Sequence, residues 1–157
     1  MRFVLSSTAA LFGAPPRIPI DEDVPVDPGS PYPLMLCCAK SRARTHSIHG
    51  NQPRLARVDR DDVWMNPADA VQRGIADGDL VRVYNERGET RLKVRVTDRV
   101  LQGVVAVKEG AWFTPNPDGA DRGGSANVLT ADRSAPCGAT TYNTNQVEIA
   151  SVNSLGA

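Results

Sequence analysis

Aromatic residues and long apolar runs are scarce in this sequence of 157 residues. Phe, Trp and Tyr make up only 5% of the chain, which disfavours a surface of aromatic rings that stacks the bases of single-stranded nucleic acid. No apolar run approaches the roughly 20 residues of a membrane-spanning helix, so we expect no direct membrane insertion.

The sequence also has few cysteines, namely Cys37, Cys38 and Cys137. Adjacent cysteines rarely bridge each other, and no pair has the Cys-x-x-Cys spacing that holds zinc or an iron–sulfur cluster. We interpret the three thiols as small buried apolar side chains.

An excess of charge of either sign is absent as well. The 18 basic and 18 acidic side chains give a formal net charge of +0, which argues against a nucleic-acid partner. The apolar content of 41% and the charged content of 23% are typical of a globular protein, and the length suits one domain with a real core.

The N-terminal region gives no clear export signal. Its short apolar stretch is preceded by a single Arg and interrupted by Ser6, Ser7 and Thr8. Residues 14–33 are rich in Pro and acidic side chains, which indicates an extended linker rather than a helix or central strand. We therefore expect the globular part to begin near Tyr32.

Short apolar or alternating runs predict a series of strands after this linker. A hairpin turn is expected at residues 85–89, with Gly88 placed for a positive φ. Residues 108–145 form a long segment rich in Gly, Pro, Asn, Asp and Thr, and loops of that length in a compact domain are usually functional. The predicted strands cover residues 34–39, 62–65, 80–84, 92–97, 104–107 and 146–149.

One short helix is predicted over residues 66–74. Asn66 is a good N-cap, Pro67 suits the first helical position, and Asp69 lies in the first turn, where a carboxylate is favoured. Gly74 then fits a left-handed C-cap. Many short strands with few helices and long loops indicate a closed β-barrel rather than a doubly wound parallel sheet.

Self-contained catalysis finds little support in the sequence. Ser47 with His46 or His49 is the only conceivable nucleophile and base, and neighbouring residues do not normally orient such a pair. His46 and His49 resemble two metal ligands, but no further ligand stands at a matching spacing. We therefore expect no catalytic or metal-ligating residues.

Anion and heterocycle binding is the better interpretation. Arg42, Arg44, Thr45, His46 and Ser47 bring guanidinium, hydroxyl and imidazole groups into six residues, and these groups suit phosphates. The glycines at 123–124 let backbone approach a flat ligand, and the amides at 143–145 suit a purine or pterin edge. A solvated basic face and a plain turn remain the alternatives.

A resemblance to a known family covers residues 32–150. The chain resembles the C-terminal molybdopterin-dinucleotide-binding domain of the dimethyl sulfoxide reductase family, and its pattern is most similar to that of the catalytic subunits of anaerobic dimethyl sulfoxide reductases. The order and spacing of the matching blocks carry this resemblance. They are residues 44–47 with Gly50 and Asn51, 66–70, 73–75, 77–83, 85–89, 96–97, 103–105, 109–113, 127–130 and 144–148.

The resemblance implies a mainly β fold, a six-stranded double-psi β-barrel with short helices and long loops, over residues 32–157. Residues 1–31 are expected to be the tail of a preceding domain and a Pro-rich linker. The implied cofactor is bis(molybdopterin guanine dinucleotide) with molybdenum or tungsten, shared with other domains. The implied cofactor-binding residues are Lys40, Ser41, Arg44, Thr45, His46, Ser47, Asp69, Trp112, Asn127, Asn143 and Thr144.

The resemblance also implies an incomplete enzyme. Catalytic chains of the family are several times longer and carry an iron–sulfur cysteine motif and a metal-ligating side chain, which are not found here. We therefore expect a part of an oxygen-atom-transferring, anaerobic respiratory oxidoreductase that is inactive alone. Its expected partners are the remaining domains or subunits. Family members are often exported to the periplasmic side of the membrane, and a cytoplasmic location is the alternative.

Two other functions compete with this expectation. One is a cofactor-free barrel that serves as an assembly or interaction module. The other is a small independent enzyme on the same barrel, like the pyruvoyl-dependent aspartate decarboxylases, which need self-processing at a Gly-Ser bond. Gly29-Ser30 and Gly124-Ser125 are the only such pairs, and neither carries the rest of that pattern.

Overall fold

The computed structural model describes residues 33–130 and 145–152. The tail and linker expected over residues 1–31 lie outside these described residues. The described elements, in chain order, are β1 (Leu34–Ala39), α1 (Pro53–Val58), β2 (Asp62–Met65), α2 (Pro67–Gln72), β3 (Leu80–Asn85), β4 (Gly88–Val96), β5 (Val104–Lys108), the 3-10 helix η2 (Ala126–Leu129) and β6 (Asn145–Ser151).

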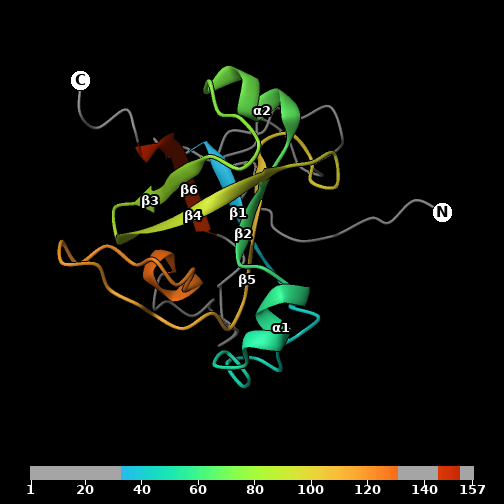
Figure 1. Ribbon diagram of the computed structural model, residues 1–157. Helices are drawn as coiled ribbons and strands as arrows, with labels where there is room; N and C mark the ends of the chain where they lie inside the picture. The colour runs from blue at the N-terminus through green and yellow to red at the C-terminus, as the bar shows by residue number, and fades with distance from the viewer. Residues whose placement is uncertain (1–32, 131–144, 153–157) are drawn as a thin grey trace, which may run out of the picture.

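The six strands close into a barrel in the order β1-β5-β2-β4-β3-β6 (Figure 1). The pairs β1 with β5 and β2 with β4 are parallel, and the other pairs are antiparallel. This mixed barrel confirms the predicted fold class, a six-stranded double-psi β-barrel with short helices and long loops.

Alternation along each strand fills the barrel with aliphatic side chains. In β2, Val63 and Met65 are fully buried, whereas the alternating residues Asp62 and Trp64 are partly exposed. The same period of two buries Val81 and Val83 on β3. Because apolar residues point inward from all six strands, one continuous core lies on the barrel axis.

The predicted strands are confirmed, with small shifts at their ends. The largest shift is in β4, which begins at Gly88, four residues before the predicted start at Leu92. The prediction of a positive φ at Gly88 was wrong. Gly88 instead allows a close approach, since a Cβ there would lie 2.7 Å from the backbone oxygen of Val128.

The helix predicted after β2 is α2, and its caps are confirmed. The Asn66 side chain accepts a hydrogen bond from the Ala68 amide (2.9 Å), and Pro67 opens the helix. Gly74 has φ +62° and follows the C-cap residue Arg73. The Asn66 amide group also donates to the Val100 oxygen (2.8 Å), which ties the helix start to the turn after β4.

Replacing Asn66 with Ala is expected to lower the free energy of unfolding by about 1–2 kcal/mol, because it removes both the cap and the bond to Val100. Asn66→Ser is the matched control, since its hydroxyl oxygen can still accept from the Ala68 amide whereas the amide donor to Val100 is lost. Urea denaturation should place Asn66→Ser between wild type and Asn66→Ala. Three superimposable curves would contradict the capping role.

Two further elements, α1 and η2, were not predicted. The six residues of α1 bury none of their side chains and so show no apolar periodicity, and only Pro53 marks its start. In the described parts of the chain, no helix is both long enough and apolar enough to cross a membrane.

Candidate functional site

The loops that leave β1 and β5 come together at one end of the barrel. Because β1 and β5 are parallel and Ala39 pairs with Lys108, both strands end side by side. Residues 40–52 follow β1 and residues 109–112 follow β5; we call these two segments the loop cluster. In Figure 1 they lie near α1, at the end of β2 away from α2.

Glu109 is the acidic centre of the loop cluster. Its carboxylate forms an ion pair with Lys40, and its Oε1 lies 3.2 Å from Nδ1 of His46. Its backbone oxygen accepts a hydrogen bond from Arg44 (3.2 Å). The Lys40 and His46 side chains are 71% and 75% exposed, so the two groups share one carboxylate at the surface.

Arg44 is a buried cation rather than part of a solvated face. Its side chain is only 8% exposed, and its guanidinium makes two hydrogen bonds to the Asp61 carboxylate (2.8 and 2.7 Å). The buried Nε of Arg44 has no hydrogen-bond partner among the described residues. The pair with Asp61 therefore holds the guanidinium in place without using all of its donors.

Asp59 fixes the start of the segment after β1. Its carboxylate accepts hydrogen bonds from the Ser41 hydroxyl (2.7 Å) and the Arg42 amide (2.9 Å), and it pairs with Lys108. Burial alone would raise the pKa of Asp59, but the bonds from Lys108, Ser41 and Arg42 outweigh burial and lower this pKa to about 2.

Asp59→Asn is expected to lower the free energy of unfolding by about 2 kcal/mol at pH 7, because the pKa depression stabilises the folded state by roughly this amount. A carboxyl group whose pKa is lower in the folded state stabilises that state when the pH is above its unfolded pKa of about 4. This stabilisation is lost as the pH falls through the pKa of the folded state. Urea denaturation of wild type and variant should therefore converge between about pH 4 and pH 2.

Asp98→Asn is the control for this pH dependence. Asp98 is exposed, and an exposed carboxylate contributes about 0–1 kcal/mol to stability. A gap between wild type and Asp59→Asn that stays constant from pH 7 to pH 3 would contradict the proposed role of the ionised Asp59.

Trp112 joins the two segments of the loop cluster. Its indole Nε1 donates a hydrogen bond to the Ser47 backbone oxygen (2.6 Å), and Gly50 lies directly against the ring. Half of Trp112 is exposed, and Thr45 and Ser47 are exposed residues of the segment that it contacts. His46 has φ +51°, so this turn presents its side chains in a conformation that non-glycine residues rarely adopt.

Asn127 lies at the same end of the barrel, on η2. The η2 helix packs on the start of β4 next to Gly88, and the Asn85 side chain donates to the Leu129 oxygen (2.8 Å) and the Gln146 oxygen (3.1 Å). Asn127 is exposed, and its backbone oxygen accepts from Thr130. No hydrogen bond or ion pair joins Asn127 to the loop cluster within the described residues.

Asp69 lies elsewhere. It is on α2, at the other end of β2 from the loop cluster (Figure 1). Asp69 is 3% exposed, and its carboxylate accepts a hydrogen bond from the Gly103 amide (2.7 Å), which ties α2 to the turn before β5. The predicted residues Asn143 and Thr144 fall outside the described part of the chain, which resumes at Asn145, opposite Leu36 in the middle of β1.

The structure thus brings together most of the predicted binding residues. The residues that meet in the loop cluster are Lys40, Ser41, Arg44, Thr45, His46, Ser47 and Trp112. The sequence reasoning missed their acidic partners Asp59, Asp61 and Glu109. Of these three, only Glu109 could have been found from the sequence, because it is the first residue of one of the blocks that carried the family resemblance.

Comparison with known proteins decides the family. A family model described as a molydopterin dinucleotide binding domain matches residues 34–146. This chain belongs to that family. Dimethyl sulfoxide reductase DmsA of Haemophilus influenzae is 47% identical over 105 residues, which cover 67% of this chain and 13% of the relative. Dimethyl sulfoxide reductase DmsA of Escherichia coli is 46% identical over 105 residues, which again cover 67% of this chain and 13% of the relative.

More distant members support the same assignment. The dimethyl sulfoxide/trimethylamine N-oxide reductase of Rhodobacter capsulatus is 42% identical over 112 residues, covering 67% of this chain and 14% of that protein. Acetylene hydratase from Pelobacter acetylenicus has a similar structure, with a TM-score of 0.65 over 76% of this chain and 18% of that one. At 16% identity, this likeness shows the shared fold alone. The family resemblance inferred from the sequence is confirmed.

Proposed function

We propose that this barrel holds part of a molybdopterin dinucleotide cofactor, bis(molybdopterin guanine dinucleotide), within a larger oxidoreductase of the dimethyl sulfoxide reductase family. The observation that carries the proposal is the buried Arg44, which lies in the loop cluster with the cation Lys40 and the imidazole of His46, inside the region that matches the family. The chain spans about 13% of the DmsA relatives, so the activity belongs to a longer protein.

The donors of the loop cluster suit the phosphates of such a cofactor. Arg44 keeps a buried Nε without a partner among the described residues. Among the described carboxylates, only that of Glu109 contacts the exposed side chains of Lys40 and His46. A pyrophosphate has the same charge sign and acceptor chemistry as this carboxylate, so it can replace Glu109 as the partner of Lys40 and of the His46 imidazole.

The other predicted residues complete the proposed contacts. The hydroxyls of Thr45 and Ser47 donate to phosphate or pterin oxygens, and the half-exposed Trp112 presents a flat ring to the ligand. We extend the proposal to Ser41, Asn127, Asn143 and Thr144, whose hydroxyl and amide groups match a heterocycle edge. We leave out Asp69, because its carboxylate already binds Gly103 at the far end of the barrel.

The cofactor supplies the metal at which an oxygen atom is transferred during anaerobic respiration. The chain's own residues neutralise its phosphates, orient its rings and exclude water on one side. Because the cofactor lies between domains, this barrel contributes only part of the buried area, and association costs several kcal/mol before any affinity appears. The isolated barrel is therefore expected to bind the cofactor weakly or not at all.

Arg44→Ala in the complete reductase that carries this barrel is expected to lower the metal and pterin content at least about tenfold, because a charge-assisted contact of about 1.5–3 kcal/mol is lost. Asn127→Ala should lower the metal and pterin content to a smaller extent. Since Asn127 is exposed, this second variant keeps the test valid if Arg44→Ala destabilises the fold.

Arg54→Ala is the matched control, because Arg54 is an exposed arginine on α1 outside the proposed contacts. Metal is measured by elemental analysis and pterin by fluorescence of its oxidised form. Wild-type metal and pterin content in both Arg44→Ala and Asn127→Ala would overturn the proposal and favour a cofactor-free assembly module.

A further inference from the structure

A groove of about 820 Å³ runs along the outer wall of the barrel over β5, β2 and β4. Eight of its lining residues are Lys or Arg and three are Asp, although the whole chain has a formal net charge of +0. We call it the basic groove. Its central residues are Trp64 on β2, Lys93 and Arg95 on β4, Ala106 on β5, and Arg99 in the turn after β4.

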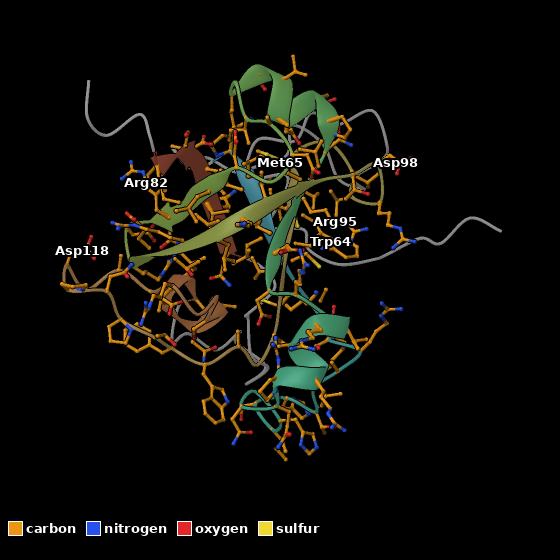
Figure 2. All side chains as sticks on the ribbon, in the orientation of Figure 1. Trp64, Met65, Arg82, Arg95, Asp98 and Asp118 are labelled. Carbon is orange, nitrogen blue, oxygen red and sulfur yellow. The ribbon has the colours of Figure 1, made fainter. Side chains whose placement is uncertain are left out.

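Strand alternation builds the floor of the basic groove. Since Val63, Met65 and Val94 point into the core, their neighbours Trp64, Lys93 and Arg95 point outward. In the register of the sheet, Trp64 lies between Arg95 on one side and Ala106 on the other. The small Ala106 leaves space beside the indole, and Figure 2 shows Trp64 and Arg95 next to each other at β2.

Most cations of the basic groove lack an acidic partner. Lys108 pairs with Asp59 inside the groove, and the Asp77 carboxylate accepts from the Val96 amide. The side chains of Arg57, Lys93, Arg95 and Arg99 make no ion pair within the described residues. The unbalanced positive charge is therefore spread along the groove from α1 to the turn after β4.

Trp64 concentrates two of these charges. The guanidinium carbons of Arg95 and Arg99 lie 5.5 and 5.9 Å from the centroid of its ring, so two like charges approach one aromatic side chain. The buried Nε1 of Trp64 has no hydrogen-bond acceptor among the described residues. An anionic group with acceptor oxygens placed here relieves the repulsion and satisfies the guanidinium donors.

We propose that the basic groove docks an acidic polypeptide segment, rich in Asp and Glu, from the remainder of the reductase. The proposal rests on the proposed function in one respect, namely that the barrel works inside a longer protein, since the chain spans 13% of its DmsA relatives. A long row of separated guanidiniums matches successive carboxylates, each of which can accept two bonds from one Arg. Arg95 and Arg99 approach the same ring at Trp64, but the other cations are spread along the groove, and this spread favours an extended chain of carboxylates over a compact phosphate.

The first test uses the purified chain and a decaglutamate peptide, followed by NMR at low salt. The peptide should shift the Trp64 indole resonance, assigned with Trp64→Phe, in a saturable way. Arg95→Glu combined with Arg99→Glu should weaken this binding at least about tenfold, because two attractive charges become repulsive. Arg122→Glu, an exposed charge reversal outside the groove, should stay within about twofold of wild type.

Two competing ligands are tested in the same way. Tripolyphosphate or a single-stranded RNA oligonucleotide that shifts the Trp64 resonance at lower concentration than decaglutamate would overturn the proposal, because the groove would then be a phosphate or nucleic-acid site. The NMR spectrum of the Arg95→Glu, Arg99→Glu variant shows whether this chain is still folded. If it unfolds, Arg57→Glu with Lys93→Glu provides the second charge reversal, with the same expected loss.

The second test uses the complete reductase and identifies the source of the acidic segment. A carbodiimide joins an amine to a carboxylate only in direct contact, so Lys93 should become cross-linked to an Asp or Glu outside the barrel. Acetylation of Lys93 should also be slower in the reductase than in the isolated chain. Equal acetylation rates without a cross-link at Lys93 overturn the docking proposal, whereas the cofactor proposal is tested separately by the metal and pterin content of Arg44→Ala.

Discussion

Asp121→Ala is expected to lower the free energy of unfolding by about 4 kcal/mol, because a fully buried carboxylate with many partners is lost. Asp121 has an exposed fraction of 0%. Its two oxygens accept five hydrogen bonds of 2.8–2.9 Å. The donors are the Thr90 hydroxyl and the backbone amides of Thr114, Gly123, Gly124 and Ser125.

Asp121 also anchors the long loop after β5 to the barrel. Its amide donates to the Glu89 oxygen (3.0 Å), and its backbone oxygen accepts from the Arg91 amide (2.8 Å), so the loop runs beside β4. The side-chain bonds then fix the loop on both sides of residue 121. Without the carboxylate, the segment that leads from Trp112 to η2 loses its common attachment.

Asp121→Asn is expected to be nearly as damaging as Asp121→Ala. An amide keeps one oxygen, but its nitrogen then faces the amide donors of Gly124 and Ser125, which need an acceptor. Thermal unfolding is the simplest measurement, and 4 kcal/mol corresponds to a fall of about 8–16 °C in Tm for a domain of this size.

Asp118→Ala is the control in the same loop. Its side chain is 52% exposed and pairs with Arg91 at the surface (2.7 Å), so we expect a much smaller fall in Tm than for Asp121→Ala. Equal changes in Tm for Asp118→Ala and Asp121→Ala would contradict the anchoring role of Asp121.

The stabilisation by Asp121 should also depend on pH. Burial by itself raises the pKa of this carboxyl, but the bonds from Thr114, Gly123, Thr90 and Ser125 outweigh burial and lower it. A carboxyl with a lowered pKa stabilises above its unfolded value and loses this effect as the pH falls through its folded value. The gap in stability between wild type and Asp121→Asn should therefore narrow in acid.

The sequence predicted the barrel well because each strand carries its own signal. Val81 and Val83 alternate with other residues along β3. The residues that begin and end α2, Asn66, Pro67 and Gly74, are likewise recognisable from the local sequence. The helix α1 was missed because it is exposed and buries no side chain. Such a helix is held by its connections rather than by an apolar stripe, so hydrophobic periodicity does not detect it.

The candidate site was only half visible in the sequence. Arg44 and its neighbours stand close together along the chain, so their donor chemistry was evident from composition alone. Their counter-ions Asp61 and Glu109 come from separate loops, and a carboxylate carries no local mark of the cation that it will meet. The sequence reasoning also assigned Asp69 by its position in a matching block, whereas the barrel places it at the opposite end from the loop cluster.

Gly110→Ala is expected to lower the free energy of unfolding by about 3 kcal/mol, because it combines backbone strain with a steric clash. Gly110 has φ +79°, a conformation that costs an alanine about 1–2 kcal/mol. A Cβ at this position would also lie 1.8 Å from the backbone oxygen of His46. Because this neighbour is backbone, it cannot rotate away as a side chain would.

Two glycines of the same loop separate these two causes. Gly119 has φ +86°, and a Cβ there would have open space around it, with no heavy atom beyond its chain neighbours within 4 Å. Gly119→Ala should therefore show the strain alone, about 1 kcal/mol. Gly123 has no positive φ, but a Cβ there would lie 1.9 Å from the Trp112 oxygen, so Gly123→Ala should show the clash alone. The three variants are compared by urea denaturation under identical conditions.

The same series tests whether the close approach of the two segments of the loop cluster matters for cofactor retention. Glu109 contacts Lys40 and His46, and the neighbouring Gly110 lies against the His46 backbone, so a shift of residue 110 is expected to move Glu109 away from both. In the complete reductase, Gly110→Ala should therefore lower the metal and pterin content, whereas Gly119→Ala should leave it unchanged. If Gly110→Ala lost no more stability and no more cofactor than Gly119→Ala, the two segments would not be packed as described, and the grouping of Arg44, His46 and Trp112 into one site would fail with them.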